Sequence, residues 1–201
     1  MSPDRTTAFK AVLIALAVMW VAEIVDVESG NELDELGIEP REPEGLVGIG
    51  TAPFLHAGFG HLLSNTLPFV ILGLAIAFEG VKRLVAVTVI VALVAGLGTW
   101  LFAPSDTVHI GASGLVFGYA AYLIVRGLFN RSLGELALAV IVVLFLGGAL
   151  LGGLVPRAGV SWQGHFFGAV GGVLAAYVLA RTSGTPRSRG SAAEAASTPA
   201  W

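Results

Sequence analysis

The sequence predicts an all-α membrane protein with several membrane-spanning helices. Of its 201 residues, 55% are hydrophobic and only 12% are charged, whereas soluble domains carry about 25% charged residues. The mean hydropathy of +0.83 agrees with this. The sequence lacks the ten-residue alternating strands that a membrane barrel needs. Helices are therefore the elements expected to cross the bilayer.

Six apolar segments follow one another along the chain, and most approach the ~20 residues that a spanning helix needs. They cover residues 8–25, 60–78, 84–103, 113–125, 133–155 and 160–180. The fourth segment is too short to span, so we expect the loop before it to dip into the membrane beside protein or water. The first two segments are separated by a strongly acidic loop, Asp26 to Gly50, which we expect to be a solvated extracytoplasmic segment.

The chain is expected to hold one domain of six helices, residues 1–181, followed by a tail. The tail, residues 182–201, is rich in Ser, Ala, Pro and Arg, and we expect it to be disordered and cytoplasmic. Basic residues favour the cytoplasmic side of a membrane. With the N-terminus inside, all but two of the 11 basic residues face the cytoplasm, and only Arg41 and Arg157 lie outside. We therefore expect a multi-pass protein of the cell membrane with both termini cytoplasmic.

This orientation brings polar residues of alternate helices to the outer side. His61 and Asn65 lie in the outer half of the second helix, and Ser113 and His165 lie at the outer ends of the fourth and sixth. At ~1.5 Å per residue, Ser113, Asn65 and His165 stand about 20 to 24 Å above the cytoplasmic boundary. They would then lie roughly 10 Å below the outer surface of a ~30 Å core. We expect a sunken aqueous pocket that holds a serine nucleophile and its histidine base.

Glycines on two of the predicted helices also favour a close approach of Ser113 to His165. Small residues four apart let membrane helices approach closely, which a short serine side chain needs in order to reach an imidazole. These motifs comprise Gly114 and Gly118 on the fourth helix and Gly164, Gly168 and Gly172 on the sixth. A serine at a helix start also offers its own unpaired amide to an oxyanion. His61 and Asn65, four apart on one face, could add side-chain donors.

Three motifs resemble those of the rhomboid proteases. His56-Ala-Gly-Phe-Gly-His61-Leu-Leu-Ser-Asn65 resembles their HxxxxHxxxN signature. Gly111-Ala-Ser113-Gly114 resembles their GxSG nucleophile motif, and His165-Phe-Phe-Gly168-Ala-Val-Gly-Gly172 resembles their histidine helix. All three fall on the expected helices, the second, fourth and sixth, of a six-helix core over about residues 8–181. The Trp-Arg pair that some members carry in the first loop is absent between Asp26 and Gly50.

The resemblance implies an intramembrane serine endopeptidase that cleaves transmembrane proteins in the bilayer near their extracytoplasmic side. It implies a Ser113–His165 dyad without an acidic third member, and an oxyanion hole formed by the Ser113 amide, His61 and Asn65. Phe117, one turn after the serine, would stack on the imidazole where many members have Tyr. The remaining supporting residues would be His56, Gly111, Gly114, Gly168 and Gly172. No cofactor, metal or nucleic acid is expected.

Two other functions remain open. A transporter would need charged residues across the membrane thickness, and the inner halves of the second, fourth and sixth helices have none. A catalytically inactive relative that only binds membrane proteins would lack the serine or the histidine, and this chain has both. A metalloprotease is disfavoured because HExxH is absent. The four histidines, His56, His61, His109 and His165, lack a neighbouring carboxylate or thiol that would favour a metal.

Overall fold

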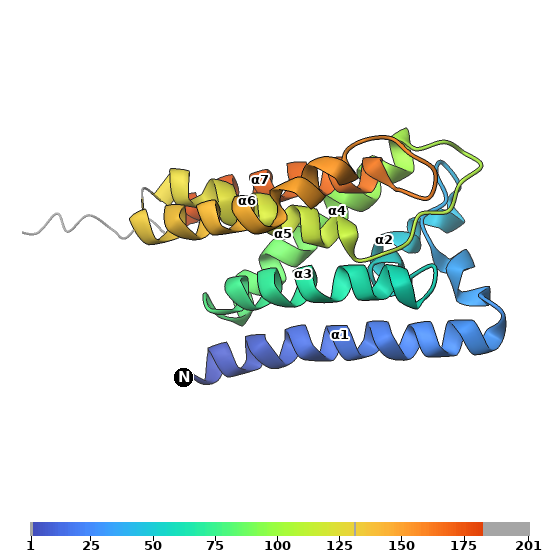
Figure 1. Ribbon diagram of the computed structural model, residues 1–201, viewed down its shortest axis with the longest axis horizontal. Coiled ribbons are helices and arrows are strands. Elements are labelled where there is room, and N and C mark those ends of the chain that lie inside the picture. The colour runs from blue at the N-terminus through green and yellow to red at the C-terminus, as the bar shows by residue number, and fades with distance from the viewer. Residues whose placement is uncertain (1, 131, 183–201) are drawn as a thin grey trace, which may run out of the picture.

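The structure, a computed structural model, describes residues 2–130 and 132–182 and forms a bundle of six long helices (Figure 1). The long helices are α1 (Pro3–Ser29), α3 (Phe59–Ala77), α4 (Val81–Phe102), α5 (Ser113–Asn130), α6 (Leu133–Gly153) and α7 (Trp162–Thr182). They coincide with the six predicted segments, so the predicted all-α fold is confirmed. Five of them, all except α5, are long and apolar enough to cross a membrane.

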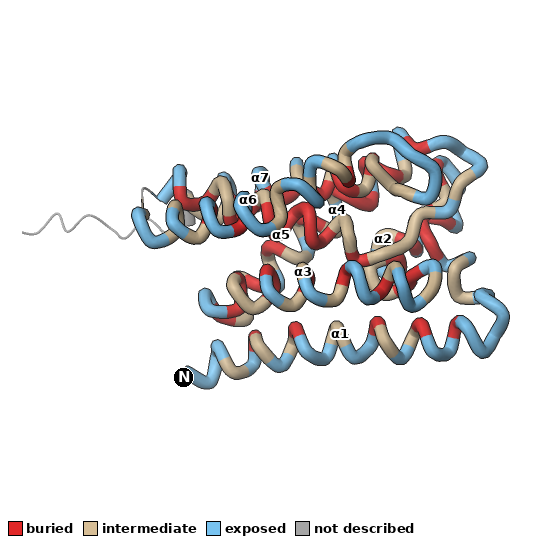
Figure 2. The backbone as a smooth tube through the Cα atoms, in the orientation of Figure 1, coloured by how far each residue is buried: buried red, intermediate tan, exposed pale blue. Residues whose placement is uncertain are grey.

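The outer surface of the bundle is apolar where a bilayer would cover it. On α6, Leu144 and Phe145 are 75% and 82% exposed, and pale blue exposed positions recur along α1 and α6 (Figure 2). Exposure of so much apolar surface to water is unfavourable, whereas lipid chains would cover it. The chain is therefore a multi-pass membrane protein.

Helix α5 is the shortest of the six and lies in the middle of the bundle. It packs against α3, α4, α6 and α7, and most of its residues are buried (Figure 2). A helix enclosed by protein does not need to reach both surfaces of the membrane, since its ends can be covered by neighbouring chain. The short fourth segment thus becomes the central helix, with Ser113 as its first residue.

The acidic first loop is more ordered than a solvated connection. Between α1 and α3 the chain forms four short helices: η1 (Glu32–Leu36), η2 (Glu44–Leu46), α2 (Gly48–Thr51) and η3 (Ala52–Phe54). Ile38 pairs with His109 in an isolated antiparallel bridge, and the Trp100 indole donates to the Glu42 carbonyl at 2.8 Å. Most acidic side chains of the loop are exposed, as expected, but Asp26 is buried. The loop therefore packs as a cap beside the loop between α4 and α5, at one end of the bundle (Figure 1).

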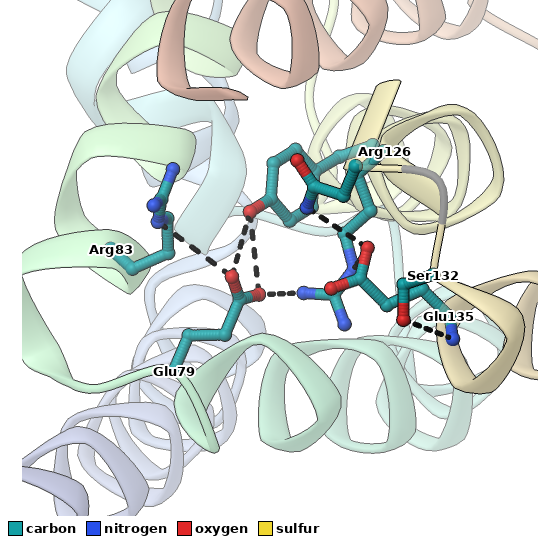
Figure 3. A network of polar contacts seen from close by, with 7 residues as sticks. Glu79, Arg83, Arg126, Ser132 and Glu135 are labelled. Atoms are coloured by element: carbon teal, nitrogen blue, oxygen red, sulfur yellow. Dashed lines mark hydrogen bonds and ion pairs between the residues drawn. The ribbon is translucent and has the colours of Figure 1, made fainter. Parts of the chain in front are cut away.

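A polar network ties four helices together at the opposite end (Figure 3). Glu79, just after α3, accepts a hydrogen bond from the Tyr122 hydroxyl at 3.2 Å and pairs with Arg83 and Arg126. Arg126 also lies 3.7 Å from a carboxylate oxygen of Glu135 at the start of α6. The network links the short turns at this end of the bundle. The longer loops lie at the other end. The predicted tail lies outside the described residues beyond Thr182.

Candidate active site

Ser113 and His165 meet at the end of the bundle where the long loops gather. The Ser113 Oγ atom lies 2.8 Å from His165 Nε2, and the His165 Nδ1 atom lies 2.7 Å from the Gly153 carbonyl oxygen. A carbonyl oxygen can only accept, so Nδ1 carries the hydrogen and Nε2 is left to accept from the serine hydroxyl. This tautomer, inferred from the hydrogen bonds, is the one that a general base requires.

The glycines of α5 and α7 allow this contact. A Cβ atom added to Gly168 would overlap the carbonyl oxygen of Gly114, and one added to Gly172 would overlap that of Gly118. The two helix backbones are therefore in direct contact over two turns. Because both dyad residues lie at the loop-side ends of these helices, the same contact brings their side chains within hydrogen-bond distance.

Phe117 and Gly153 hold the imidazole from two sides. The Phe117 ring stacks on His165 with a centroid separation of 4.2 Å and an interplanar angle of 4°. A Cβ atom on Gly153 would lie 2.5 Å from Phe117 Cζ and 3.0 Å from His165 Nδ1. Only glycine therefore fits at residue 153. Nothing in the sequence indicated a role for Gly153, because a backbone carbonyl leaves no residue-type signal and a pair of glycines at a helix end is common.

His61 lies against the backbone that leads into Ser113. An ideal Cβ on Gly111 would lie 2.9 Å from His61 Nε2 and 3.8 Å from Ser113 Oγ, so both groups border the same space. Gly111 also has φ +117°, a conformation that residues with a side chain rarely adopt. The Ala57 amide donates to His61 Nδ1 at 3.3 Å, so Nε2 carries the hydrogen and is able to donate.

Asn65 and the start of α5 complete a set of donors. One amide hydrogen of the buried Asn65 binds the His61 carbonyl at 3.1 Å, which leaves the second hydrogen for another acceptor. The Ser113 amide is in the first turn of α5, where amides have no intrahelical partner. His61, Asn65 and Ser113 therefore lie in the wall of one cleft.

A cleft of about 1260 Å³ runs past these residues, with Ser113, His165, Phe117, His61 and Asn65 in its wall. Pockets for small ligands usually measure about 300–1,000 Å³. The cleft is larger than this range.

His56 lies beside the dyad but not in it. Its ring is 1% exposed, and its Nε2 atom accepts from the Ala112 amide at 3.3 Å, next to Ser113. Burial, and secondarily the neighbouring His61, lowers the pKa of His56 to about 4. A neutral imidazole is needed for this acceptor role, so His56 steadies the backbone before the serine.

His109 connects the two loops that precede the dyad residues, a role that the sequence did not predict. The Thr107 hydroxyl donates to the Pro104 carbonyl, so it accepts from His109 Nε2 at 2.8 Å. The Ser161 hydroxyl can then donate to His109 Nδ1 at 2.7 Å, and the Ser161 carbonyl accepts from the His165 amide. Burial lowers the pKa of His109, which favours this neutral form. Across the described part of the chain, no three His, Cys, Asp or Glu side chains are placed to hold a metal ion.

Comparison with known proteins decides the family. The model of the Rhomboid domain matches residues 43–182. The chain belongs to the rhomboid family. The match begins in the first loop and covers every residue of the candidate site.

The chain is also similar to several bacterial proteins. Over 178 residues, the chain is 44% identical to an uncharacterised protein of Mycobacterium tuberculosis, covering 84% of this chain and 73% of that protein. It is 42% identical to an uncharacterised protein of Mycobacterium leprae over 179 residues, covering 84% and 70%. A Bacillus subtilis protein named "Putative rhomboid protease YdcA" is 30% identical over 130 residues, covering 64% of each chain.

Proposed function

We propose that this rhomboid protein is an intramembrane serine endopeptidase that cleaves transmembrane proteins with a Ser113–His165 dyad. The observation that carries the proposal is the 2.8 Å contact between Ser113 Oγ and His165 Nε2, with His165 Nδ1 bound to the Gly153 carbonyl. A serine in a glycine-rich membrane helix is usually a packing residue. Here the hydroxyl faces the correct nitrogen of an oriented imidazole at the wall of a large cleft.

The reaction would pass through an acyl-enzyme. Ser113 Oγ attacks the substrate carbonyl carbon while His165 Nε2 takes the hydroxyl proton. The Gly153 carbonyl stabilises the resulting imidazolium through its Nδ1 hydrogen. Negative charge on the tetrahedral oxygen is bound by the Ser113 amide, His61 Nε2 and the free hydrogen of Asn65.

His165 then returns the proton to the leaving amine, and the C–N bond breaks. Water attacks the Ser113 ester with His165 again acting as base, which releases the second product and restores the serine. A substrate helix must unwind before Ser113 can reach its backbone, because helical carbonyls are already hydrogen-bonded. Substrates with Gly or Pro near the outer end should unwind at lower cost, so we expect them to be cleaved faster.

The site would face the extracytoplasmic side of the cell membrane, with both termini in the cytoplasm. The distribution of basic residues supports this orientation, since Arg41 and Arg157 are the only ones on the loop side with the site among the residues that the structure describes. Because the chain has no cysteine, Ser113→Cys introduces a single thiol. An impermeant thiol reagent should label this thiol in intact cells. Labelling that occurs only when the reagent can reach the cytoplasmic face would show that the site faces the cytoplasm instead.

Cleavage of a model transmembrane substrate in proteoliposomes tests the function. The wild-type protein should cut the substrate near its outer end, and Ser113→Ala and His165→Ala should each abolish cutting while keeping a wild-type melting temperature. Ser64→Ala is the matched control, because Ser64 also lines the cleft but its hydroxyl binds its own helix at the His61 carbonyl. A membrane-protein binder without activity would retain the substrate uncut in all four proteins, and undiminished cutting by either dyad variant would refute the mechanism.

A further inference from the structure

Three acidic residues lie together where α1 meets the first loop. Glu23 and Asp26 are near the end of α1 and are 1% and 3% exposed, and Asp34 lies in η1. Both carboxylate oxygens of Glu23, one of Asp26 and one of Asp34 are buried without a hydrogen-bond partner. The Gly58 amide is near Glu23 but already donates to the His56 carbonyl at 2.9 Å. The other Asp26 oxygen accepts from the Leu33 amide at 2.7 Å.

These carboxylates are close enough to repel one another. Glu23 interacts electrostatically with both Asp26 and Asp34, and Asp26 also acts on Asp34. Burial, with the added effect of Asp26, raises the pKa of Asp34. None of the ion pairs found among the described residues includes any of the three; those pairs join Glu79 and Glu135 to arginines at the opposite end. Buried carboxylates without a partner cost several kcal/mol each, so the cluster favours a positive ligand.

The geometry of the cluster and its position limit what that ligand is. The described residues include no group of three or more carboxylates and imidazoles arranged around a metal ion. A wider cation with several N–H donors fits separated oxygens better. Of the three acidic residues, Asp34 lines the same cleft as Ser113 and His165. A polypeptide bound for cleavage would therefore pass Asp34.

We propose that Asp34, backed by Asp26 and Glu23, is a substrate-binding subsite for the ammonium or guanidinium group of a lysine or arginine on the extracytoplasmic side of the scissile bond. This subsite rests on the proposed protease function. Basic residues are uncommon on the outer flanks of membrane proteins. A subsite that requires a basic residue would distinguish a small group of substrates from most membrane helices. This selection would act in addition to selection by the ease of helix unwinding.

The test uses pairs of transmembrane peptides that differ by Lys or Gln at one outer-flank position, with that position moved residue by residue. At the matching position, the wild-type protein should cleave the Lys peptide with a KM about tenfold lower, as expected for a hydrogen bond to a charged group. Added salt should reduce the difference. Asp34→Asn should bring the KM of the Lys peptide to that of the Gln peptide. Glu35→Gln, an exposed neighbour in the same short helix that does not line the cleft, should keep the full preference.

Two further results decide the proposal. Asp34→Lys should reverse the preference, so that a Glu peptide is cleaved better than a Lys peptide. If Asp34→Asn affects both peptides equally, Asp34 has a structural role and the subsite is refuted. The subsite is also refuted if the wild-type protein shows no charge preference. Cleavage without charge preference refutes the subsite alone, whereas failure to cleave any peptide refutes the protease function itself.

Discussion

The Gly153 carbonyl orients the imidazole at the position where a serine-protease triad has an acidic residue. It accepts the His165 Nδ1 hydrogen at 2.7 Å, while the Phe117 ring fixes the plane of the imidazole. The sequence motifs predicted which serine and histidine would meet, because each lies at a helix start on the same side of the membrane. They did not predict Gly153 or His109. A backbone carbonyl has no residue type, and the bond from His109 to Ser161 spans 52 residues.

Asn65→Ala should slow cleavage about 10²–10³-fold, mainly through kcat, because one donor to the oxyanion is lost. The dyad contact would remain, so turnover should not vanish. Steady-state kinetics on a model substrate, with Ser64→Ala as the neighbouring control on α3, measures the effect. A rise in KM with kcat unchanged would place Asn65 in substrate binding instead.

His56 should make the fold sensitive to acid. Its pKa of about 4 lies below the ordinary value of 6.5, so the unfolded chain binds a proton at a higher pH than the folded protein does. Stability is therefore lost as the pH falls from 6.5 to 4, by roughly 3 kcal/mol for this residue. His56→Gln should remove that part of the loss. Unfolding in detergent at about pH 7 and about pH 4.5 compares the two proteins, and an identical acid loss in both would contradict the assignment.

At the scale of elements, the contact between α5 and α7 carries the site. The GxxxG spacings predicted this contact, and the missing Cβ atoms of Gly168 and Gly172 show why a larger residue does not fit. The fourth segment was predicted to end at residue 125, whereas α5 continues to Asn130 and is 18 residues long. The order of the first loop was not predicted, because its contacts, such as the Ile38–His109 bridge, join segments far apart in the sequence. Residue propensities and hydrophobic periodicity depend only on residues that are close in the sequence, so they do not predict such contacts.

Gly172→Ala should separate α5 from α7 although it lies two turns from the dyad. Its methyl group would overlap the Gly118 carbonyl, and overpacking of this kind costs typically 1–3 kcal/mol. We expect a lower melting temperature and reduced cleavage together. Gly147→Ala on α6 is the control, because its methyl group would meet only Val143 at 3.6 Å, an ordinary contact. Equal behaviour of the two variants would show that the close contact is not needed.

The whole molecule has two ends of different character. One end is closed by short turns and the network around Glu79, while the other carries the long loops, the cleft and the dyad (Figure 1). Membrane class and helix order were accessible from hydropathy and spacing. The acidic pair buried beneath the first loop was not, because burial of a charged residue depends on the folded loop.

The central claim is that Ser113 is the nucleophile and His165 its base, and a fluorophosphonate that reacts with activated serines tests it directly. After reaction of the wild-type protein in proteoliposomes, peptide mass spectrometry should find the adduct on Ser113 and not on Ser64 or Ser161, which line the same cleft. Cleavage should fall in proportion to the adduct, and His165→Ala should prevent its formation. Undiminished cleavage by protein fully modified at Ser113, or loss of cleavage that follows an adduct on another serine, would contradict the account.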